Sequence, residues 1–176
     1  MIIKIYAACI FMRMDKALEN RIGAFALTVS DKVQQAITTR FDKAGETPAA
    51  LTAIGAAPGL TISDLQPVLR LSQPGTVRLV DRLVADGLVE KRKGEDARQV
   101  LLYLTAKGKR LRRSLLDLRH QAIVQLTQGL DVAQRETLIG LLDQMMRDYP
   151  TCEMDKYQAC RMCDQDACAR CPIPAL

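Results

Sequence analysis

Apolar side chains recur along most of the chain at three- and four-residue steps, a spacing that predicts helices with one buried face. The first stripe predicts a long helix over residues 16–42, and Gly45 ends it. Thr47 and Pro48 then provide an N-cap and a first-turn proline for a short helix through about Ala56. The stripe of the long helix consists of Ile22, Phe25, Ala26, Val29, Val33, Ala36 and Ile37.

Two further short helices follow. Thr61 and Asp64 form a variant of the capping box, which predicts a helix over residues 61–71. Pro67 lies inside this helix, and because proline removes a backbone hydrogen bond, we expect it to kink or shorten the helix. Ser72 caps the next helix, over residues 73–86, and Gly87 ends that helix.

The helix over residues 73–86 has two predicted faces. Its apolar face is expected to consist of Val77, Val80, Leu83 and Val84. The side chains expected to project elsewhere are Thr76, Arg78, Asp81 and Arg82.

Two strand-like runs, residues 88–92 and 100–104, come next and predict a β-hairpin. The polar loop between them contains Gly94 and Asp96, which favour a turn. This loop is longer than a tight turn needs, so we expect it to protrude.

The remaining pattern predicts two closing helices. Thr105 caps the first, and Asp131 with Gln134 opens the second, which Pro150 stops. After Pro150 we expect the helical pattern to end. The apolar face of the first closing helix consists of Leu111, Leu115, Leu118, Ala122 and Leu126. The second carries Leu138, Ile139, Leu141, Leu142, Met145 and Met146.

Composition fits this helical reading. The 176 residues are 48% hydrophobic but only 4% aromatic, so an aliphatic core is expected in a mostly helical globular protein. No apolar run reaches about 18 residues, so we expect no membrane partner. Residues 1–12 resemble an export signal only superficially, because they lack a proper basic region. We therefore expect a cytoplasmic protein.

Positive charge is concentrated in the centre of the chain. Residues 61–113 hold twelve Lys or Arg and six Asp or Glu, whereas the rest of the chain is almost neutral. Such a segment is typical of a surface that binds a polyanion. The alternative is a solvated helical face, on which Arg78 and Arg82 would pair with Asp81 or Asp86.

Three helices followed by a hairpin are the order of a winged helix-turn-helix, whose second helix enters the major groove of DNA. Arg78 and Arg82 lie four residues apart, hence on one helical face, and arginine suits bidentate contact with guanine. Arg98 at the hairpin tip is placed to reach a minor groove. Tyr103 is the one aromatic between residues 42 and 148, which disfavours RNA modules that stack bases on aromatic side chains.

Three runs resemble the MarR family of bacterial transcriptional regulators: residues 79–92, 95–98 and 104–108. The resemblance covers about residues 20–149. It implies a homodimer held together by the first helix and the two closing helices. It also implies double-stranded DNA as partner and a small-molecule effector between the dimerisation helices and the winged domain. The DNA-binding residues that it implies are Ser72, Gln73, Thr76, Arg78, Arg82 and the wing residue Arg98, which Asp96 steadies.

The expected fold class is therefore mainly α with a small β-hairpin wing. We divide the chain into an N-terminal extension (1–14), an N-terminal dimerisation helix (15–45), a winged helix-turn-helix domain (46–108), C-terminal dimerisation helices (109–150) and a Cys-rich tail (151–176).

The expected function is a homodimeric DNA-binding regulator on a pseudo-palindromic operator, modulated by a small-molecule effector. Two other classes are an architectural winged-helix protein and a small redox or metal-handling enzyme. An enzyme is disfavoured because His120 is the one histidine and no Gly-rich phosphate loop occurs.

The tail carries five of the six cysteines. Two Cys-x-x-Cys pairs predict a tetrahedral zinc site made of Cys160, Cys163, Cys168 and Cys171. The ligand set stays open because Cys152 provides a fifth thiol. Redox-active thiols, an iron–sulfur cluster and an unstructured tail are the alternatives. The alternative trigger for regulation is accordingly metal binding or thiol oxidation in this tail.

Overall fold

Helices dominate the computed structural model, which describes residues 2–41, 45–96, 99–149, 152–165, 167 and 171–173. Side chains are described from Lys16 onward, except those of residues 148 and 153. The helices are α1 (Ile2–Arg40), α2 (Thr47–Ala56), α3 (Ile62–Leu69), α4 (Gln73–Ala85), α5 (Ala106–Thr127), α6 (Val132–Asp148) and α7 (Glu153–Cys160). One antiparallel hairpin, β1 (Val89–Lys93) and β2 (Val100–Leu104), completes the described elements. The expected class, mainly α with a hairpin wing, is confirmed.

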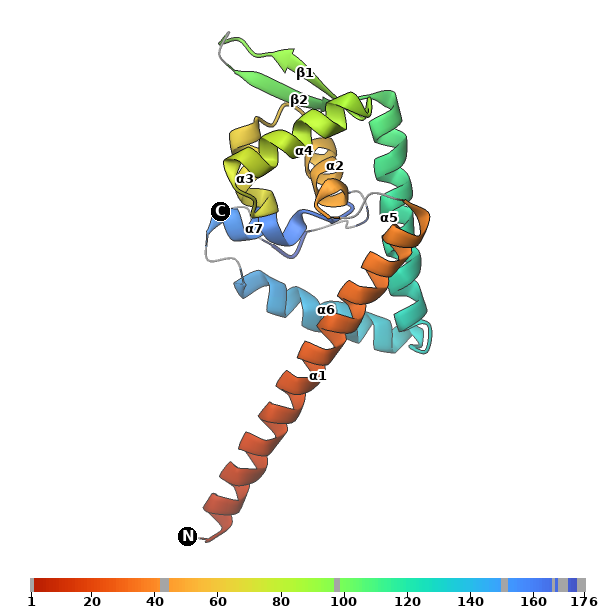
Figure 1. The fold of residues 1–176 in the computed structure, drawn as a ribbon. Coiled ribbons are helices and arrows are strands. Elements are labelled where there is room, and N and C mark those ends of the chain that lie inside the picture. The colour runs from red at the N-terminus through yellow and green to blue at the C-terminus, as the bar shows by residue number, and fades with distance from the viewer. Residues whose placement is uncertain are drawn as a thin grey trace.

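Two parts of the molecule differ in shape (Figure 1). The short helices α2, α3 and α4 gather with the hairpin at one end, and α5 runs down beside them. α1 projects away as a long rod, α6 runs back from the far end of α5, and α7 lies beside α3. None of the described helices combines the length and apolar character that a membrane crossing requires.

The backbone of α1 is helical from Ile2, whereas the apolar stripe predicted a helix only from about residue 16. The last turns of α1 are the part that packs. Ile37 is buried in the core and Val33 packs against that core, while most side chains from residues 16 to 32 are exposed. Among the described side chains, α1 therefore packs mainly through its C-terminal turns, and its main partner helix is α5.

Local signals in the sequence set the ends of α3. Thr61 accepts a hydrogen bond from the Asp64 amide at 3.2 Å, and the Asp64 carboxylate accepts one from the Thr61 amide at 2.9 Å. This is the predicted capping box. Pro67 lies inside α3, which ends two residues later at Leu69, so the helix is shortened as expected.

One predicted cap is wrong. α2 begins at Thr47 itself, and Glu46 occupies the N-cap position without a side-chain cap. Thr47 is instead buried. Pro48 still lies in the first turn, where its missing N–H leaves no intrahelical bond unmade.

The predicted apolar face of α4 is partly wrong. Ser72 caps this helix as expected, accepting a hydrogen bond from the Gly75 amide at 3.3 Å. Thr76, however, is fully buried, and its hydroxyl donates to the Ser72 carbonyl at 3.1 Å. Because that hydroxyl is satisfied within the helix, the methyl group can enter the core. The buried face consists of Thr76, Leu79, Val80 and Leu83.

The core lies between the three short helices, the hairpin and α5. Its largest fully buried side chains are Leu51, Ile54, Leu65, Leu83, Leu88, Leu102 and Leu115. The hairpin joins this core because its register pairs Val89 with Leu104, both of which are buried. Leu60 adds a single bridge to Leu102, which ties the segment before α3 to the sheet.

α4, the hairpin and α5 meet at a close junction. Gly87 has a φ of +67° and follows α4 in a Schellman motif, in which the Leu88 amide donates to the Leu83 carbonyl at 2.9 Å. Thr105 caps α5 and donates through its hydroxyl to the Gly87 carbonyl at 2.7 Å. A Cβ at Gly108 would lie 2.0 Å from the Leu88 carbonyl oxygen, so only glycine fits.

The two closing segments differ from the expectation in one respect. α6 begins at the predicted capping box of Asp131 and Gln134. The expectation that helical structure ends after Pro150 is wrong, because α7 forms over Glu153–Cys160. α7 packs on α3.

Candidate nucleic-acid interface

The N-terminus of α4 is exposed. Ser72 and Gln73 are exposed, and Pro74 follows them in the first turn. The Ser72 hydroxyl satisfies one amide, that of Gly75. The first turn of a helix concentrates partial positive charge, so this end of α4 is suited to contact a phosphate group.

Arg78 and Arg82 extend that positive surface along α4. Both side chains are exposed, and no ion pair joins either guanidinium to another described residue. Asp81, which was a candidate partner, pairs instead with Lys91 on β1 at 2.6 Å. The two arginines therefore keep their donors available, and Asp81 links α4 to the hairpin.

The hairpin presents further cationic side chains. Lys91, Arg92 and Lys93 are exposed on β1. The Arg92 guanidinium lies 4.4 Å from the centre of the Tyr103 ring and pairs with Glu90, so its position is fixed. The sequence pattern did not indicate these contacts, because they join residues that meet only through the strand register.

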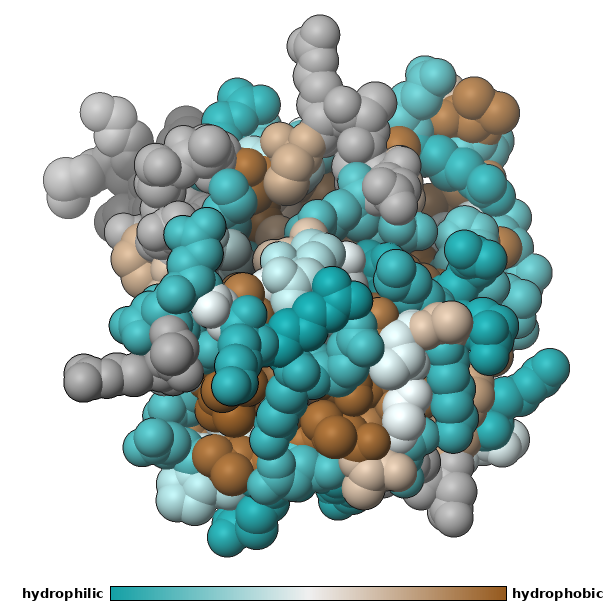
Figure 2. Space-filling view, turned by 90° about the horizontal axis from the view of Figure 1, so that it is seen from above, coloured by the Kyte–Doolittle hydropathy of each residue, from teal (hydrophilic) through white to brown (hydrophobic). Residues whose placement is uncertain are grey.

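Most of the sequence-predicted DNA-binding residues share this end of the molecule. Ser72, Gln73, Arg78 and Arg82 are exposed on or next to α4, and Asp96 is exposed in the hairpin loop. The expectation that Thr76 projects outward is wrong, because its side chain is buried. Arg98 lies outside the described residues. Figure 2, viewed from the hairpin end, shows a surface that is mostly hydrophilic with small apolar patches between.

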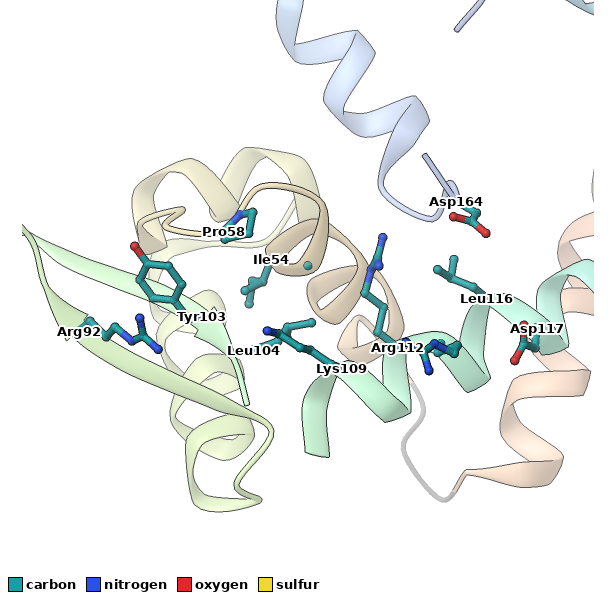
Figure 3. Close-up of a pocket in the computed structure, with 12 residues that line it drawn as sticks. Ile54, Pro58, Arg92, Tyr103, Leu104, Lys109, Arg112, Leu116, Asp117 and Asp164 are labelled. Atoms are coloured by element: carbon teal, nitrogen blue, oxygen red, sulfur yellow. The ribbon is translucent and has the colours of Figure 1, made fainter. Parts of the chain in front are cut away.

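A cavity of about 440 Å³ lies between the hairpin, α2 and α5 (Figure 3). Arg92 and Tyr103 approach it from the hairpin, Ile54 from α2, and Arg112 from α5. Two further basic side chains on α5, two acidic ones and four apolar or small residues complete its wall. These are Lys109, Arg113, Asp117, Asp164, Gly55, Pro58, Leu104 and Leu116.

Arg112 is the unusual member of this wall. Its Nε atom is buried and has no hydrogen-bond partner among the described residues. A Cβ at Gly55 would lie 2.4 Å from the Arg112 Cδ, so the missing side chain of Gly55 makes room for the guanidinium stem. An unsatisfied buried donor is unfavourable, and an anionic ligand would supply the missing acceptor.

The predicted zinc ligands are only partly described. Cys160 and Cys163 are half-buried, Cys171 is exposed, and Cys168 lies outside the described residues. Within the described ranges, no three His, Cys, Asp or Glu side chains are already arranged to hold a metal ion. The zinc site therefore stays a prediction.

A capped helix pair, a two-stranded wing packed on it and a cationic surface shared by both define a winged helix-turn-helix protein. Residues 47–99 match the sequence profile of the MarR family. In this segment and in its fold, the chain is therefore similar to the MarR family.

Two curated regulators are similar to this chain over part of their length. The HTH-type transcriptional regulator PetP of Rhodobacter capsulatus is 36% identical over 99 residues, which cover 53% of this chain and 60% of PetP. The HTH-type transcriptional regulator BilQ of Clostridium symbiosum is 29% identical over 93 residues, covering 52% of this chain and 65% of BilQ. The chain thus spans less than two thirds of either regulator.

Solved structures extend the likeness beyond the winged domain. Wild-type apo MarR from E. coli has a TM-score of 0.62 and 25% identity, covering 73% of this chain and 96% of MarR. A MarR family regulator from Listeria monocytogenes, solved in complex with 26mer DNA, has a TM-score of 0.57 and 18% identity, covering 78% of this chain and 89% of that chain. The second likeness concerns the fold alone.

Proposed function

We propose that this chain is a DNA-binding transcriptional regulator that acts as a homodimer and reads duplex DNA with α4 and the hairpin. The observation that carries this proposal is a pair of exposed arginines on α4 that form no ion pair with a described residue and lie beside a helix N-terminus and a cationic strand. The match of residues 47–99 to the MarR family profile and the naming of both curated relatives as transcriptional regulators support it. In this proposal Arg78 and Arg82 contact base edges or phosphates, whereas Ser72 and Gln73 contact phosphates.

The test uses duplexes that the full-length protein selects from a random-sequence pool. Arg78→Ala and Arg82→Ala should each weaken binding to the selected duplex by about 1–3 kcal/mol, because each removes a charged donor from the groove or the backbone. Arg40→Ala is the matched control: it removes the same charge from the last turn of α1 and should leave affinity unchanged. Fluorescence anisotropy of labelled duplex measures each affinity.

The salt dependence of the same binding reaction adds a second criterion. The logarithm of the affinity should fall linearly with the logarithm of salt concentration, by about 0.9 for every phosphate contacted. Each arginine that contacts a phosphate should lower this slope by about 1 when it is replaced by alanine. Unchanged affinity and slope in both α4 variants would show that α4 is not the reading helix.

The homodimer is supported by apolar side chains that the single chain leaves exposed. They lie on α1, at the end of α5 and along α6, where exposed apolar groups gather instead of occurring singly. The residues are Leu18, Ile22, Phe25, Leu27, Val124, Val132, Ile139, Leu141, Leu142 and Met145. A second copy of the chain is the occupant that we propose for these faces, because α1 and α6 both project beyond the folded winged end.

The effector that we propose is a small organic anion with an apolar body, bound in the cavity beside Arg112. The unsatisfied Arg112 Nε provides a donor for a carboxylate or phenolate, and Ile54 and Leu116 provide apolar walls. The residues that line this cavity come mainly from α5, the hairpin and α2. A ligand that binds better to one arrangement of these elements than to another would shift their equilibrium.

Benzoate-class carboxylates serve as probes of this site. Isothermal titration should detect binding to the parent protein, and Arg112→Gln should weaken it at least about tenfold because a charge-assisted hydrogen bond is lost. Arg110→Gln on the same helix is the control, since Arg110 is exposed and does not line the cavity. Equal binding of the carboxylate by the parent and by Arg112→Gln would show that this cavity is not the effector site.

A further inference from the structure

The turn between α3 and α4 has a backbone conformation that its own sequence does not favour. Arg70 has a φ of +55° and is the one residue other than glycine with a positive φ in the part of the chain that the structure describes. A side chain in this left-handed region is strained, and glycine is the usual residue there. Contacts that favour this conformation must therefore offset the strain.

Two backbone hydrogen bonds define the turn. The Arg70 amide donates to the Pro67 carbonyl at 3.2 Å, and the Leu71 amide donates to the Gln66 carbonyl at 3.3 Å. This is a Schellman motif, in which glycine is the commonest residue at the position of Arg70. Both distances are at or beyond the usual upper limit for N–H···O bonds, so these two bonds alone hold the turn weakly. Ser72, which caps α4, follows directly, so the turn sets the direction in which α4 begins.

The side chain of Gln158 on α7 bonds to both ends of this turn. Its Nε2 donates to the Pro67 carbonyl at 3.0 Å, and its Oε1 accepts from the Arg70 Nε at 2.7 Å. The Pro67 carbonyl thus accepts from the Arg70 amide and from Gln158, which uses both of its lone pairs. One side-chain amide therefore links the carbonyl that closes the turn to the residue that carries the strain.

Packing of the C-terminal segment, residues 152–165, keeps Gln158 at this place. α7 lies beside α3 (Figure 1), and Gln158 is half-buried there. The Arg161 guanidinium donates to the Gln158 carbonyl, and Met162 packs against the core. α7 has only eight residues and is too short to be a stable helix by itself, so its order depends on these contacts.

We propose that Gln158 is a positioning residue for DNA binding: it holds Arg70 in the left-handed conformation and thereby fixes the direction of α4. Gln158 acts through the turn and not by contacting DNA. The C-terminal segment then supports the helix-turn-helix, and loss of α7 from α3 loosens the turn before the reading helix while the core stays folded. The part that concerns DNA rests on the function proposed above, whereas support of the turn can be measured on the protein alone.

The effect of replacing Gln158 should depend on the residue at position 70. Glycine adopts a positive φ without strain, so Arg70→Gly removes both the strain and the side chain to which Gln158 bonds. Gln158→Ala should then matter in the parent and much less in Arg70→Gly, because the two residues form one coupled unit. A general loosening of the fold would instead affect both backgrounds equally.

The first test measures hydrogen exchange of individual backbone amides by NMR, on the full-length chain without DNA. Gln158→Ala should accelerate exchange at residue 70 and at Leu71 at least about threefold, because two hydrogen bonds to the turn are lost. In the Arg70→Gly background the same replacement should change exchange at both positions by less than about a factor of two. Gln165→Ala is the matched control, because Gln165 is exposed on the same segment and forms no hydrogen bond with the described residues of the turn.

The second test measures affinity for the selected duplex by fluorescence anisotropy. Gln158→Ala should weaken binding at least about threefold in the parent, and by less than about twofold when it is added to Arg70→Gly. Gln165→Ala should bind as the parent does.

Each result decides one part of the inference. Unchanged exchange in Gln158→Ala would overturn the support of the turn, and equal acceleration in both backgrounds would overturn it by showing a general loosening of the fold. Accelerated exchange with unchanged DNA affinity would overturn the positioning of α4. A parent that binds no duplex would overturn the proposed function and the DNA part of this inference, whereas the exchange experiment would still decide whether Gln158 supports the turn.

Discussion

Individual residues show which local interactions can be predicted from the sequence and which cannot. Thr61, Ser72 and Thr105 were predicted as N-caps, and each accepts a hydrogen bond from an amide three residues later. Such caps depend on a few neighbouring residues, so the sequence alone reveals them. Thr76 was misjudged because a polar residue usually faces solvent. Its burial depends on an intrahelical hydrogen bond and on the core above it.

Gly108 provides a direct test of how closely α5 approaches the hairpin. Gly108→Ala should destabilise the fold by about 1–3 kcal/mol, because the new methyl group would overlap the Leu88 carbonyl and force α5 away from the hairpin. Gly140→Ala on α6 is the control: nothing lies within 4 Å of its Cβ position, and alanine favours helix by up to about 1 kcal/mol. Urea unfolding measures both changes. Equal stability of parent and Gly108→Ala would contradict the close approach at this junction.

At the level of elements, helix starts were predicted better than helix partners. The bounds of α4 and the hairpin and the start of α5 agree with the expectation within one or two residues. α7 was missed because its eight residues carry no strong apolar stripe and follow a proline. Its docking depends on Gln158 meeting Pro67 and Arg70, about ninety positions earlier in the chain. Periodicity reports one element at a time and cannot reveal such a pairing.

In the candidate site too, features within one helix could be predicted from the sequence, whereas contacts between elements could not. Arg78 and Arg82 were found from the sequence because their four-residue spacing places both on one helical face. The tie between Asp81 and Lys91 and the cavity around Arg112 were not found, since both join separate elements. Gly55 was the one available signal for the cavity: a glycine inside a helix often marks a close approach. In the structure, the side chain of Arg112 occupies the space that a side chain at Gly55 would fill.

The whole molecule leaves apolar side chains of α1 and α6 exposed, and we propose that a second copy of the chain covers them. Ile139→Glu/Leu142→Glu on α6 should convert the proposed dimer to monomers, because two charges would be placed in an apolar interface. Gln144→Glu, an added charge on an exposed polar position of the same helix, should leave the dimer intact. Sedimentation equilibrium measures the masses. A parent that sediments as a monomer at every concentration would contradict the homodimer.

The junction of Gly87, Thr105 and Gly108 has a mechanical consequence for the whole molecule. At this junction the end of α4, the first residues of the hairpin and the start of α5 are held together by a hydrogen bond and a close backbone approach. The ion pair of Asp81 and Lys91 is a second link between α4 and the hairpin. A movement of the far end of α5 would therefore turn α4 and the hairpin together as one rigid unit. In the proposed dimer, such a movement would change the distance between the two winged domains and leave the internal shape of each domain unchanged.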